Sequence, residues 1–458
     1  MCYTLNVFPD LLKLQQTHPQ RYPHLLESVA HGTPQARYDI LFAFPEHTLS
    51  LLAGSRIVRD GRLAGVGDFL AAFEHLWSEH ASAAACVRNM PTMQGINLPF
   101  TGGWFVYFGY ELAAQIESKL KHIPVVPDLP LASITRIPAA IIRDHVTGLT
   151  HLLCESNRAD ALIGEMQCDV RRQATRTEAA VEVVQLHEDA PSIFLNGVER
   201  TLDYIRAGDV FQVNLSRSWE ATLSKPVAAA ALYDRLRRTN PAPFAGLMTL
   251  DENTAVISSS PERLVNVTGD LIRTRPIAGT YPRSDDRQQD ERWSQELLRH
   301  PKERAEHVML IDLERNDLGR VCRVGTVEVN ELMVLESYRH VHHIVSEVSG
   351  TLREEVTPAQ VIRAVFPGGT ITGCPKVRCM EIIAELEGTA RGPYTGSMGY
   401  INRDGSMDLN ILIRTMVLQA HHVRLRAGAG IVADSKPRRE LHETRAKAKG
   451  MLAALGYG

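Results

Sequence analysis

Four glutamates stand in two pairs of identical spacing, and each pair could contribute to a metal site. Glu303 and Glu306 lie in PKERAEHVMLIDLERNDLGR, and Glu440 and Glu443 lie in SKPRRELHETRAKAKG. Residues three apart on a helix share a face, so each pair presents two carboxylates to one place. If the pairs meet in the fold, four carboxylates require a cation among them, and Mg²⁺ with oxygen ligands is expected. The alternative is that each pair is a solvated helix face, as is usual for glutamate.

Other polar side chains occupy positions that could present them to a substrate. Glu262 comes directly after Pro261 at the end of the predicted strand AVISSS, so it cannot continue into a helix. Gln212 lies on the polar face of the alternating strand VFQVNLSRSWEATL, where it points either into a cavity or into solvent. His342 and His343 are neighbours in another predicted strand, and alternation places them on opposite faces.

Glycine-rich turns predict places where an anion can bind. In FPGGTITGCPKVRCMEIIAELE a polar loop with Thr370 precedes an amphipathic helix, whose free N–H groups and dipole favour an anion, although a plain helix cap is the alternative. Small residues at Gly279 and from Gly428 to Gly430 let backbone amides approach a carboxylate. Arg414 lies in the predicted strand LNILIRTMVL, where burial is costly unless the guanidinium meets an anion.

Composition limits the classes of protein to which the chain can belong. The chain has 458 residues, 44% of them hydrophobic and 22% charged, as in an ordinary soluble globular protein. A net charge of −3 leaves no basic surface for nucleic acid, and no apolar run is long enough to span a membrane. The seven cysteines show no Cys-x-x-Cys spacing, which indicates reduced thiols and a cytoplasmic protein.

The elements that position these residues fall into three regions that we expect to form one compact unit. Residues 1–150 read as short strands and turns with a few helices, and 151–190 as a polar connection. Residues 191–455 contain the candidate site residues on alternating strands and helices. Asp404 and Gly405 predict a hairpin turn, with Arg414 in its second strand.

Taken together, the motifs resemble those of the chorismate-utilising enzymes, a family that includes the first components of anthranilate synthase and aminodeoxychorismate synthase. From Ser260 to Thr444 they are SPERLV, RTRPIAGT, KERAEHVMLIDLERNDLGR, HHIVSEVSG, FPGGTITGCPKVRCMEIIAELE, GSMGYINRDGSMDLNILIRTM and GAGIVADSKPRRELHET. RYDIL and FTGGWFVYFGYE extend the match into the N-terminal third. The resemblance implies an α+β fold, a two-layer antiparallel β-sandwich with surrounding helices and a site between the layers.

The resemblance also implies a role for individual residues. Mg²⁺ would be held by Glu306 and Glu443, with Glu303 and Glu440 as nearby carboxylates, and would bridge the ring carboxylate of chorismate. Glu262 would be the general acid at the leaving 4-hydroxyl, a role that requires a pKa raised by burial. The implied catalytic set is Glu262, His343, Gln212 and Thr280. The implied substrate contacts are Gly279, Thr280, Thr370, Tyr394, Arg414, Gly428, Ala429, Gly430 and Lys447.

Two positions bear on the nucleophile and the product. Gln212 stands where relatives that add water carry lysine, and glutamine cannot deprotonate water, so ammonia is expected. Ala278 stands where aminodeoxychorismate synthases often carry a lysine that attacks the ring, and where anthranilate synthases carry alanine. FPGGTITG and QVNLS, however, resemble aminodeoxychorismate synthase more closely. The expected activity is amination of chorismate to 4-amino-4-deoxychorismate for para-aminobenzoate and folate synthesis, with anthranilate synthesis as the alternative.

Further expectations concern partners. The chain has no glutaminase nucleophile motif, so ammonia would come from a separate glutamine amidotransferase subunit. In relatives the N-terminal region holds tryptophan, and the partial match here predicts a tryptophan pocket at Glu27, Ser28, Asn240, Pro241 and Phe244. A catalytically silent subunit that binds tryptophan or a partner is therefore a further alternative.

Overall fold

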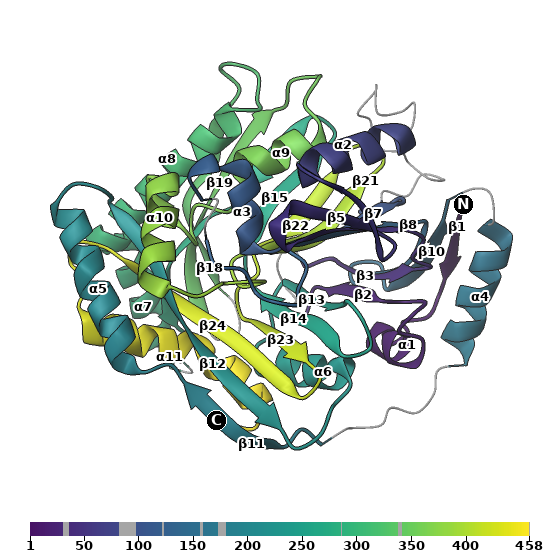
Figure 1. The fold of residues 1–458 in the computed structure, drawn as a ribbon, viewed down its shortest axis with the longest axis horizontal. Helices are drawn as coiled ribbons and strands as arrows, with labels where there is room; N and C mark the ends of the chain where they lie inside the picture. The colour runs from purple at the N-terminus through teal and green to yellow at the C-terminus, as the bar shows by residue number, and fades with distance from the viewer. Residues whose placement is uncertain are drawn as a thin grey trace.

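Two antiparallel β-sheets pack face to face, and helices cover their outer faces (Figure 1). The computed structural model describes residues 1–30, 36–81, 98–120, 123–155, 159–172, 180–284, 286–337 and 341–457. This arrangement confirms the α+β sandwich that the motifs imply. Among the described helices, none has a stretch of sufficient length and hydrophobicity to cross a membrane.

The first sheet combines strands from both ends of the chain. Its order is β1 (Cys2–Leu5), β10 (Leu149–Cys154), β9 (Ala139–Asp144), β3 (Tyr38–Ala43), β2 (His24–Glu27), β13 (Phe244–Thr249), β14 (Thr254–Ser260), β23 (Thr415–Gln419), β24 (His422–Ile431), β12 (Gln212–Leu223) and β11 (Val183–Glu188), with β20 (Gly373–Cys374) also on β12. Strand β2 pairs with β13, so residues 1–150 and 191–455 share this sheet.

The second sheet is built in the same way. Its order is β17 (Ile277–Pro282), β19 (Val341–Thr351), β16 (Leu271–Thr274), β15 (Arg263–Thr268), β22 (Met407–Asn410), β21 (Ser397–Asn402), β7 (Gly103–Phe108), β8 (Ala132–Ile137), β4 (Thr48–Leu52), β5 (Arg56–Arg59) and β6 (Arg62–Val66), with β18 (Glu328–Ser337) on β19. Here the early strand β7 pairs with the late strand β21.

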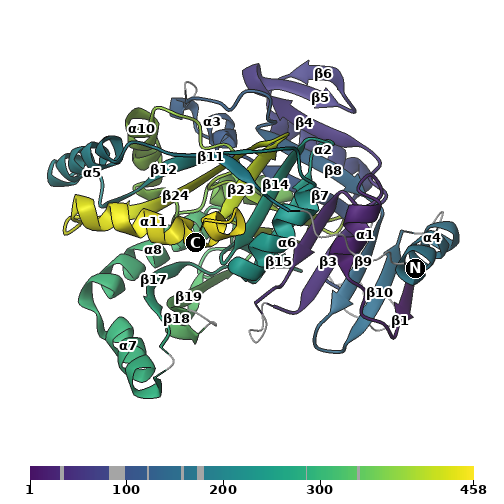
Figure 2. The same cartoon turned by 90° about the horizontal axis from the view of Figure 1, so that it is seen from below.

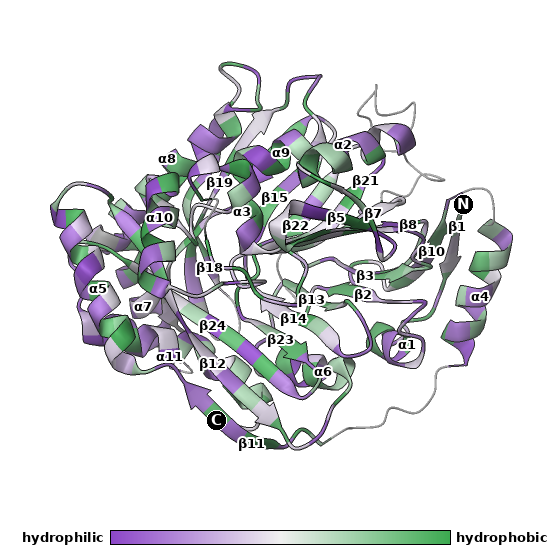
Figure 3. Cartoon of the chain, in the orientation of Figure 1, coloured by the Kyte–Doolittle hydropathy of each residue, from purple (hydrophilic) through white to green (hydrophobic). Residues whose placement is uncertain are grey.

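Helices shield the outer face of each sheet. They are α1 (Leu11–Thr17), α2 (Phe69–His80), α3 (Ala113–Ile116), α4 (Ala159–Arg171), α5 (Pro191–Arg206), α6 (Ala229–Thr239), α7 (Arg287–Arg299), α8 (Pro301–Gly319), α9 (Pro358–Val365), α10 (Lys376–Glu387) and α11 (Pro437–Ala454). Helices α6 and α11 lie along the first sheet, as Figure 2 shows, whereas α2 and α9 pack together over the second. Figure 3 shows mixed hydrophilic and hydrophobic faces on α2 and α5, as expected of helices that cover a core.

An apolar core fills the space between the sheets. Phe42 of β3 meets Phe105 of β7 edge-on, with ring centroids 5.2 Å apart. Tyr107, Met398 and Tyr400 of the second sheet belong to the same buried cluster. Since strand side chains alternate between faces, these residues fix which face of each sheet points inward.

Local signals in the sequence place the helices that carry the candidate residues. Helix α8 begins at Pro301, where a missing N–H costs nothing, and the ring of His300 accepts a hydrogen bond from the backbone N–H of Glu303. Helix α10 ends at Gly388, which adopts a left-handed conformation with φ 59°.

One local prediction is wrong. Arg414 was expected inside a strand, but β22 ends at Asn410 and Arg414 lies before β23 with φ 52°. The reason is a competing set of hydrogen bonds, because Leu412 exchanges backbone bonds with Thr395 and Gly396 instead of continuing the ladder. The predicted hairpin turn at Asp404 and Gly405 does join β21 to β22.

Candidate active site

A polar pocket lies between the inner faces of the two sheets, and we call it the inner pocket. Its walls contain seven of the residues predicted from the sequence: Glu262, His343, Thr370, Tyr394, Arg414, Gly428 and Lys447. They come from segments far apart in the chain, including β19 of the second sheet, β24 of the first sheet and helix α11. The fold therefore concentrates acid, base and cationic groups in one place.

Glu262 is the acidic group of the inner pocket. Its side chain is buried, and Thr370 Oγ1 donates a hydrogen bond of 2.8 Å to Glu262 Oε1. Burial raises the pKa of the Glu262 carboxyl to about 7, although the hydrogen bond from Thr370 and the charge of Arg414 oppose the shift. A carboxyl with this pKa can hold and release a proton near neutral pH, as a general acid must.

Cationic and phenolic groups also line the inner pocket. Lys447 Nζ donates a hydrogen bond of 3.0 Å to the carbonyl oxygen of Gly428. A Cβ atom at Gly428 would lie 2.7 Å from the hydroxyl oxygen of Tyr394, so only glycine leaves this space open. Burial raises the pKa of Tyr394 to about 12, so its hydroxyl remains a hydrogen-bond donor. With Arg414 in the same lining, these donors suit a carboxylate.

The two neighbouring histidines face different surroundings, as alternation predicts. His342 lies 3.0 Å from Asp290 and 2.7 Å from Ser337, outside the pocket. His343 lines the pocket, and burial lowers its pKa to about 4, so the ring is neutral. It pairs with Thr280 in the β17–β19 ladder, next to a bulge at Gly279, where φ is 71°.

A second, larger cavity of about 1230 Å³ opens outside the inner pocket, and we call it the outer cavity. Its walls come from α8, from the start of α10 and from the segment after β24. Glu306 lines this cavity, whereas Glu303 turns toward Gly279, where a Cβ atom would lie 3.0 Å from Glu303 Oε2. The carboxylates of Glu303 and Glu306 thus have different surroundings.

The four glutamates of the predicted metal site have different surroundings in the structure. Glu443 pairs with Lys447 at 2.7 Å, and Glu440 is buried on the same helix. No group of three or more His, Cys, Asp or Glu side chains within the described ranges could hold a metal ion. All four glutamates are nevertheless oxygen donors of the type that Mg²⁺ prefers, and carboxylates repel one another when no cation lies between them.

Four further predicted residues, Gln212, Gly279, Ala429 and Gly430, are outside the wall of the inner pocket. Gln212 packs over Gly430, where a Cβ atom would lie 2.4 Å from Gln212 Nε2. Ala429 alternates with its glycine neighbours, and its side chain belongs to an apolar cluster on the outer face of the sheet. Any contact of Ala429 with a substrate would therefore have to use its backbone. Ala278 of β17 is nearly buried and supplies no amine.

Sequence reasoning missed two polar residues of the inner pocket, Asn214 and Arg426. The alternation that singled out Gln212 also places Asn214 on the same face, so that signal was present. Arg426 joins Arg391 in a buried ion-pair network around Glu387, with nitrogen–oxygen distances of 2.9 and 2.6 Å. No local pattern in the sequence indicates this network.

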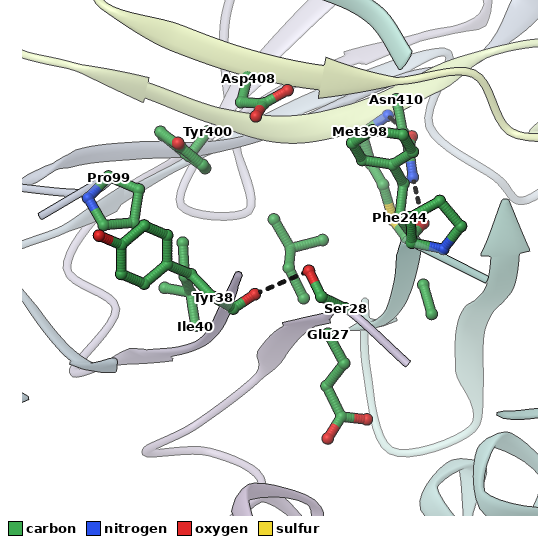
Figure 4. A pocket seen from close by; sticks show the side chains of 13 residues that line it. Glu27, Ser28, Tyr38, Ile40, Pro99, Phe244, Met398, Tyr400, Asp408 and Asn410 are labelled. Atoms are coloured by element: carbon green, nitrogen blue, oxygen red, sulfur yellow. Dashed lines mark hydrogen bonds between the residues drawn. The ribbon is translucent and has the colours of Figure 1, made fainter. Parts of the chain in front are cut away.

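A smaller pocket between the sheets contains part of the predicted tryptophan pocket, and we call it the inter-sheet pocket (Figure 4). Ser28 and Phe244 line it together with Met398 and Tyr400. Glu27 also lines it, but its carboxylate points away from the cavity in Figure 4 and accepts hydrogen bonds from Tyr233 and Arg237.

Two residues of that prediction do not line the inter-sheet pocket. Asn240 ends helix α6, and its side-chain amide donates to the carbonyl oxygen of Ser259 at 3.1 Å. Pro241 follows it and is also outside the lining. Strand β2 pairs with β13, and this pairing brings Ser28 and Phe244 together. Asn240 and Pro241 precede β13 in the chain, so they are not part of this pairing.

Comparisons with known proteins show which family the chain resembles. The family model described as chorismate binding enzyme matches residues 33–453. The chain is 39% identical over 450 residues to anthranilate synthase component 1 of Thermus thermophilus, covering 97% of this chain and 94% of that protein. It is 38% identical over 461 residues to aminodeoxychorismate synthase component 1 of Bacillus subtilis, again covering 97% and 94%. The crystal structure of anthranilate synthase component I from Streptococcus pneumoniae superposes with a TM-score of 0.77 at 30% identity, covering 92% of this chain and 93% of that one.

Proposed function

The chain belongs to the family of chorismate binding enzymes, in the class of anthranilate synthase and aminodeoxychorismate synthase first components, and we propose that it aminates chorismate to 4-amino-4-deoxychorismate. The observation that carries the proposal is the inner pocket, in which a carboxyl with a pKa of about 7, a neutral histidine and cationic side chains line one space. The net reaction consumes chorismate and ammonia and releases water.

Binding of the dicarboxylate follows from the charges of the pocket. Arg414, Tyr394 and the Gly428–Gly430 segment would hold the enolpyruvyl carboxylate, since a guanidinium and a phenol are strong donors to an anion. Lys447 lies close enough to Gly428 to reinforce this end. Gly279, Thr280 and Thr370 would contact the other end of the substrate.

Glu262 would protonate the leaving 4-hydroxyl, which departs as water. Because its pKa is raised to about 7, an appreciable fraction of the enzyme carries this proton at neutral pH. His343 is neutral and would orient the ring. In relatives with lysine at the position of Ala278, the amine adds at ring carbon 2. Here ammonia or water would add there, and would leave again when ammonia forms the new bond at carbon 4.

Mg²⁺ would be held by Glu306 and Glu443, and Glu303 and Glu440 are further oxygen donors on the same two helices. When bound, it would act as a template and Lewis acid at the ring carboxylate. Ammonia would come from a separate glutamine amidotransferase subunit. Gln212 supports ammonia as the nucleophile, because an amide cannot remove a proton from water.

Anthranilate synthesis is the second candidate, and Ala278 favours it. In that reaction chorismate and ammonia give anthranilate, pyruvate and water. Incubation of the protein with chorismate, Mg²⁺ and ammonium separates the two products. We expect an aminated product that yields para-aminobenzoate only after a lyase is added, whereas fluorescent anthranilate with pyruvate and no lyase would refute the proposal.

A catalytically silent subunit that binds tryptophan or a partner is the remaining alternative. The Glu306→Gln variant, compared with the parent protein, tests it. We expect Glu306→Gln to lose Mg²⁺-dependent turnover while its melting temperature without Mg²⁺ stays close to that of the parent. A silent subunit would show no turnover in the parent protein either. We also propose that the inter-sheet pocket takes tryptophan, because it offers aromatic and apolar walls of suitable character.

A further inference from the structure

A second buried carboxyl lies near the general acid Glu262. Glu314 belongs to helix α8 and is 7% exposed, and it is in the lining of neither the inner pocket nor the outer cavity. A buried carboxylate is costly unless a cation compensates its charge. The main cation that acts on Glu314 is Lys376, but its ammonium forms an ion pair with Asp317. Stability alone therefore does not explain a carboxyl at this position, and a functional role is expected.

The glycine-rich loop before α10 touches both carboxyls through neighbouring residues. A Cβ atom at Gly369 would lie 3.3 Å from Glu314 Oε1, so a side chain at this position would press against the carboxyl. Thr370, the next residue, donates its hydroxyl hydrogen to Glu262 Oε1 across 2.8 Å. Since the Cα atoms of neighbouring residues are only about 3.8 Å apart, the loop brings the two carboxyls into the same buried region.

The charges around Glu314 couple it to the acid. Burial raises the pKa of Glu314, and the negative charges of Asp317 and Glu262 raise it further. Lys376 and the hydroxyl of Thr274 oppose the rise. An interaction between two carboxyls is reciprocal, so an ionised Glu314 disfavours the ionised form of Glu262 to the same extent.

This negative neighbour opposes the cations of the inner pocket. Arg414 and Lys447 favour the ionised form of Glu262 and so lower its pKa, and the hydrogen bond from Thr370 acts in the same direction. A general acid must carry its proton when the substrate is bound. Glu314 therefore supplies a charge that the acid needs, and it does so from outside the lining of the pocket.

We propose that Glu314 and Glu262 share a proton, so that Glu314 keeps the general acid protonated under conditions in which Glu262 alone would ionise. The inference rests on the proposed amination and adds a positioning residue for the acid. When Glu262 gives its proton to the leaving hydroxyl, water departs and the new carbon–nitrogen bond leaves an ammonium group. That group returns one proton to the pair and becomes the amine. Two carboxyls that interact in this way titrate as a pair.

The first test compares pH profiles of turnover, with chorismate, ammonia and Mg²⁺ saturating at every pH. Glu314→Gln keeps the side-chain volume and removes the charge. We expect the falling limb of the profile to move to lower pH by about half a unit or more, because the acid loses its negative neighbour. Asp312→Asn removes an exposed carboxylate that pairs with Arg315 on the same helix, and this control should leave the limb in place.

The second test needs no turnover. Infrared spectra recorded against pH follow the carbonyl band of protonated carboxyls in the protein without substrate. We expect the parent protein to release the two protons in two coupled steps, and the variants Glu262→Gln and Glu314→Gln each to release one fewer. The carboxyl that remains should ionise at lower pH than the second step of the parent. If Glu314→Gln does not fold, the titration of Glu262→Gln decides alone.

The two measurements separate the pair from the proposed function. Proton sharing is refuted if the remaining carboxyl ionises at the pH of the second step in the parent, or if the limb of Glu314→Gln stays with that of the Asp312→Asn control. If the parent forms no aminated product but releases the two protons in coupled steps, the proposed function fails and the pair stands. Normal amination with an unshifted limb overturns the pair alone.

Discussion

Thr370 donates its hydroxyl hydrogen to Glu262 across 2.8 Å, and this contact joins the glycine-rich loop before α10 to the acidic group of the inner pocket. The bond stabilises the ionised carboxylate, whereas burial stabilises the protonated form. Burial is the larger effect, so the pKa of Glu262 rises to about 7. The contact therefore tunes the acid as well as positioning it.

The first prediction concerns this acid. Turnover that needs protonated Glu262 should be constant below pH 7 and fall about tenfold per unit above it. Thr370→Val removes a bond that lowers the pKa, so the falling limb should move to higher pH. In Glu262→Gln, kcat should fall about 10²- to 10⁴-fold, and the decline of turnover at high pH should disappear. A limb that stays at the same pH in Thr370→Val would contradict this assignment.

The second prediction concerns Arg414. Arg414→Lys keeps the charge but loses the planar pair of donors, so the KM for chorismate should rise about tenfold or more. Steady-state kinetics with chorismate as the varied substrate measure this change. Arg424→Lys, an exposed arginine paired with Glu220, is the control and should leave the KM unchanged. An equal change in both variants would show that Arg414 makes no special contact.

The third prediction concerns Mg²⁺ and needs no substrate turnover. A ligand that binds only the folded state raises its stability with concentration, so millimolar Mg²⁺ should raise the melting temperature. Glu306→Gln and Glu443→Gln should each remove this rise, whereas Glu328→Gln on exposed β18 should retain it. If both site variants keep the full rise, Mg²⁺ binds elsewhere.

The fourth prediction concerns the buried network behind the pocket. Glu387→Gln should lower the free energy of unfolding by about 3–5 kcal/mol, because it leaves Arg391 and Arg426 buried without their shared carboxylate. Glu385→Gln, two residues earlier on α10 and exposed, should cost about 1 kcal/mol or less. Urea unfolding at pH 7 measures both values.

The same network predicts the sign of a pH effect. The pKa of Glu387 is lowered in the fold, with the charges of Arg391 and Arg426 as the main stabilising causes. Its contribution to stability is therefore present above its unfolded pKa of about 4.3 and is lost as the pH falls through the lower folded value. The difference between the parent protein and Glu387→Gln should shrink in acid, and a difference that grows would contradict the network.

The fifth prediction concerns the inter-sheet pocket. Phe244 lies in its wall with the guanidinium of Arg263 4.9 Å from its ring centroid, so Phe244→Ala opens the wall. Calorimetric titration should show tryptophan binding to the parent protein and at least tenfold weaker binding to this variant. Phe8→Ala, at an exposed phenylalanine that does not line the pocket, should bind like the parent. If the parent protein does not bind tryptophan, the proposal that the inter-sheet pocket takes tryptophan is refuted.

Much of the candidate site could be predicted because its residues are defined by local rules. Proline and capping fix the start of α8, and a left-handed glycine ends α10. The motifs from Ser260 to Thr444 identified the family, and seven of the residues that the resemblance implied line one pocket. The alternation of side chains along a strand also predicted correctly that His342 and His343 lie on opposite faces.

The tertiary structure decided how distant segments meet, since alternation defines the two faces of a strand but not what lies opposite each face. It placed Asn214 and Arg426 in the inner pocket, and it put Arg414 in a left-handed turn held by backbone bonds to a distant segment. It also left Asn240 outside the inter-sheet pocket. The sequence by itself determined the chemical groups and their local geometry. Long-range strand pairing and side-chain packing determined which of those groups share a cavity.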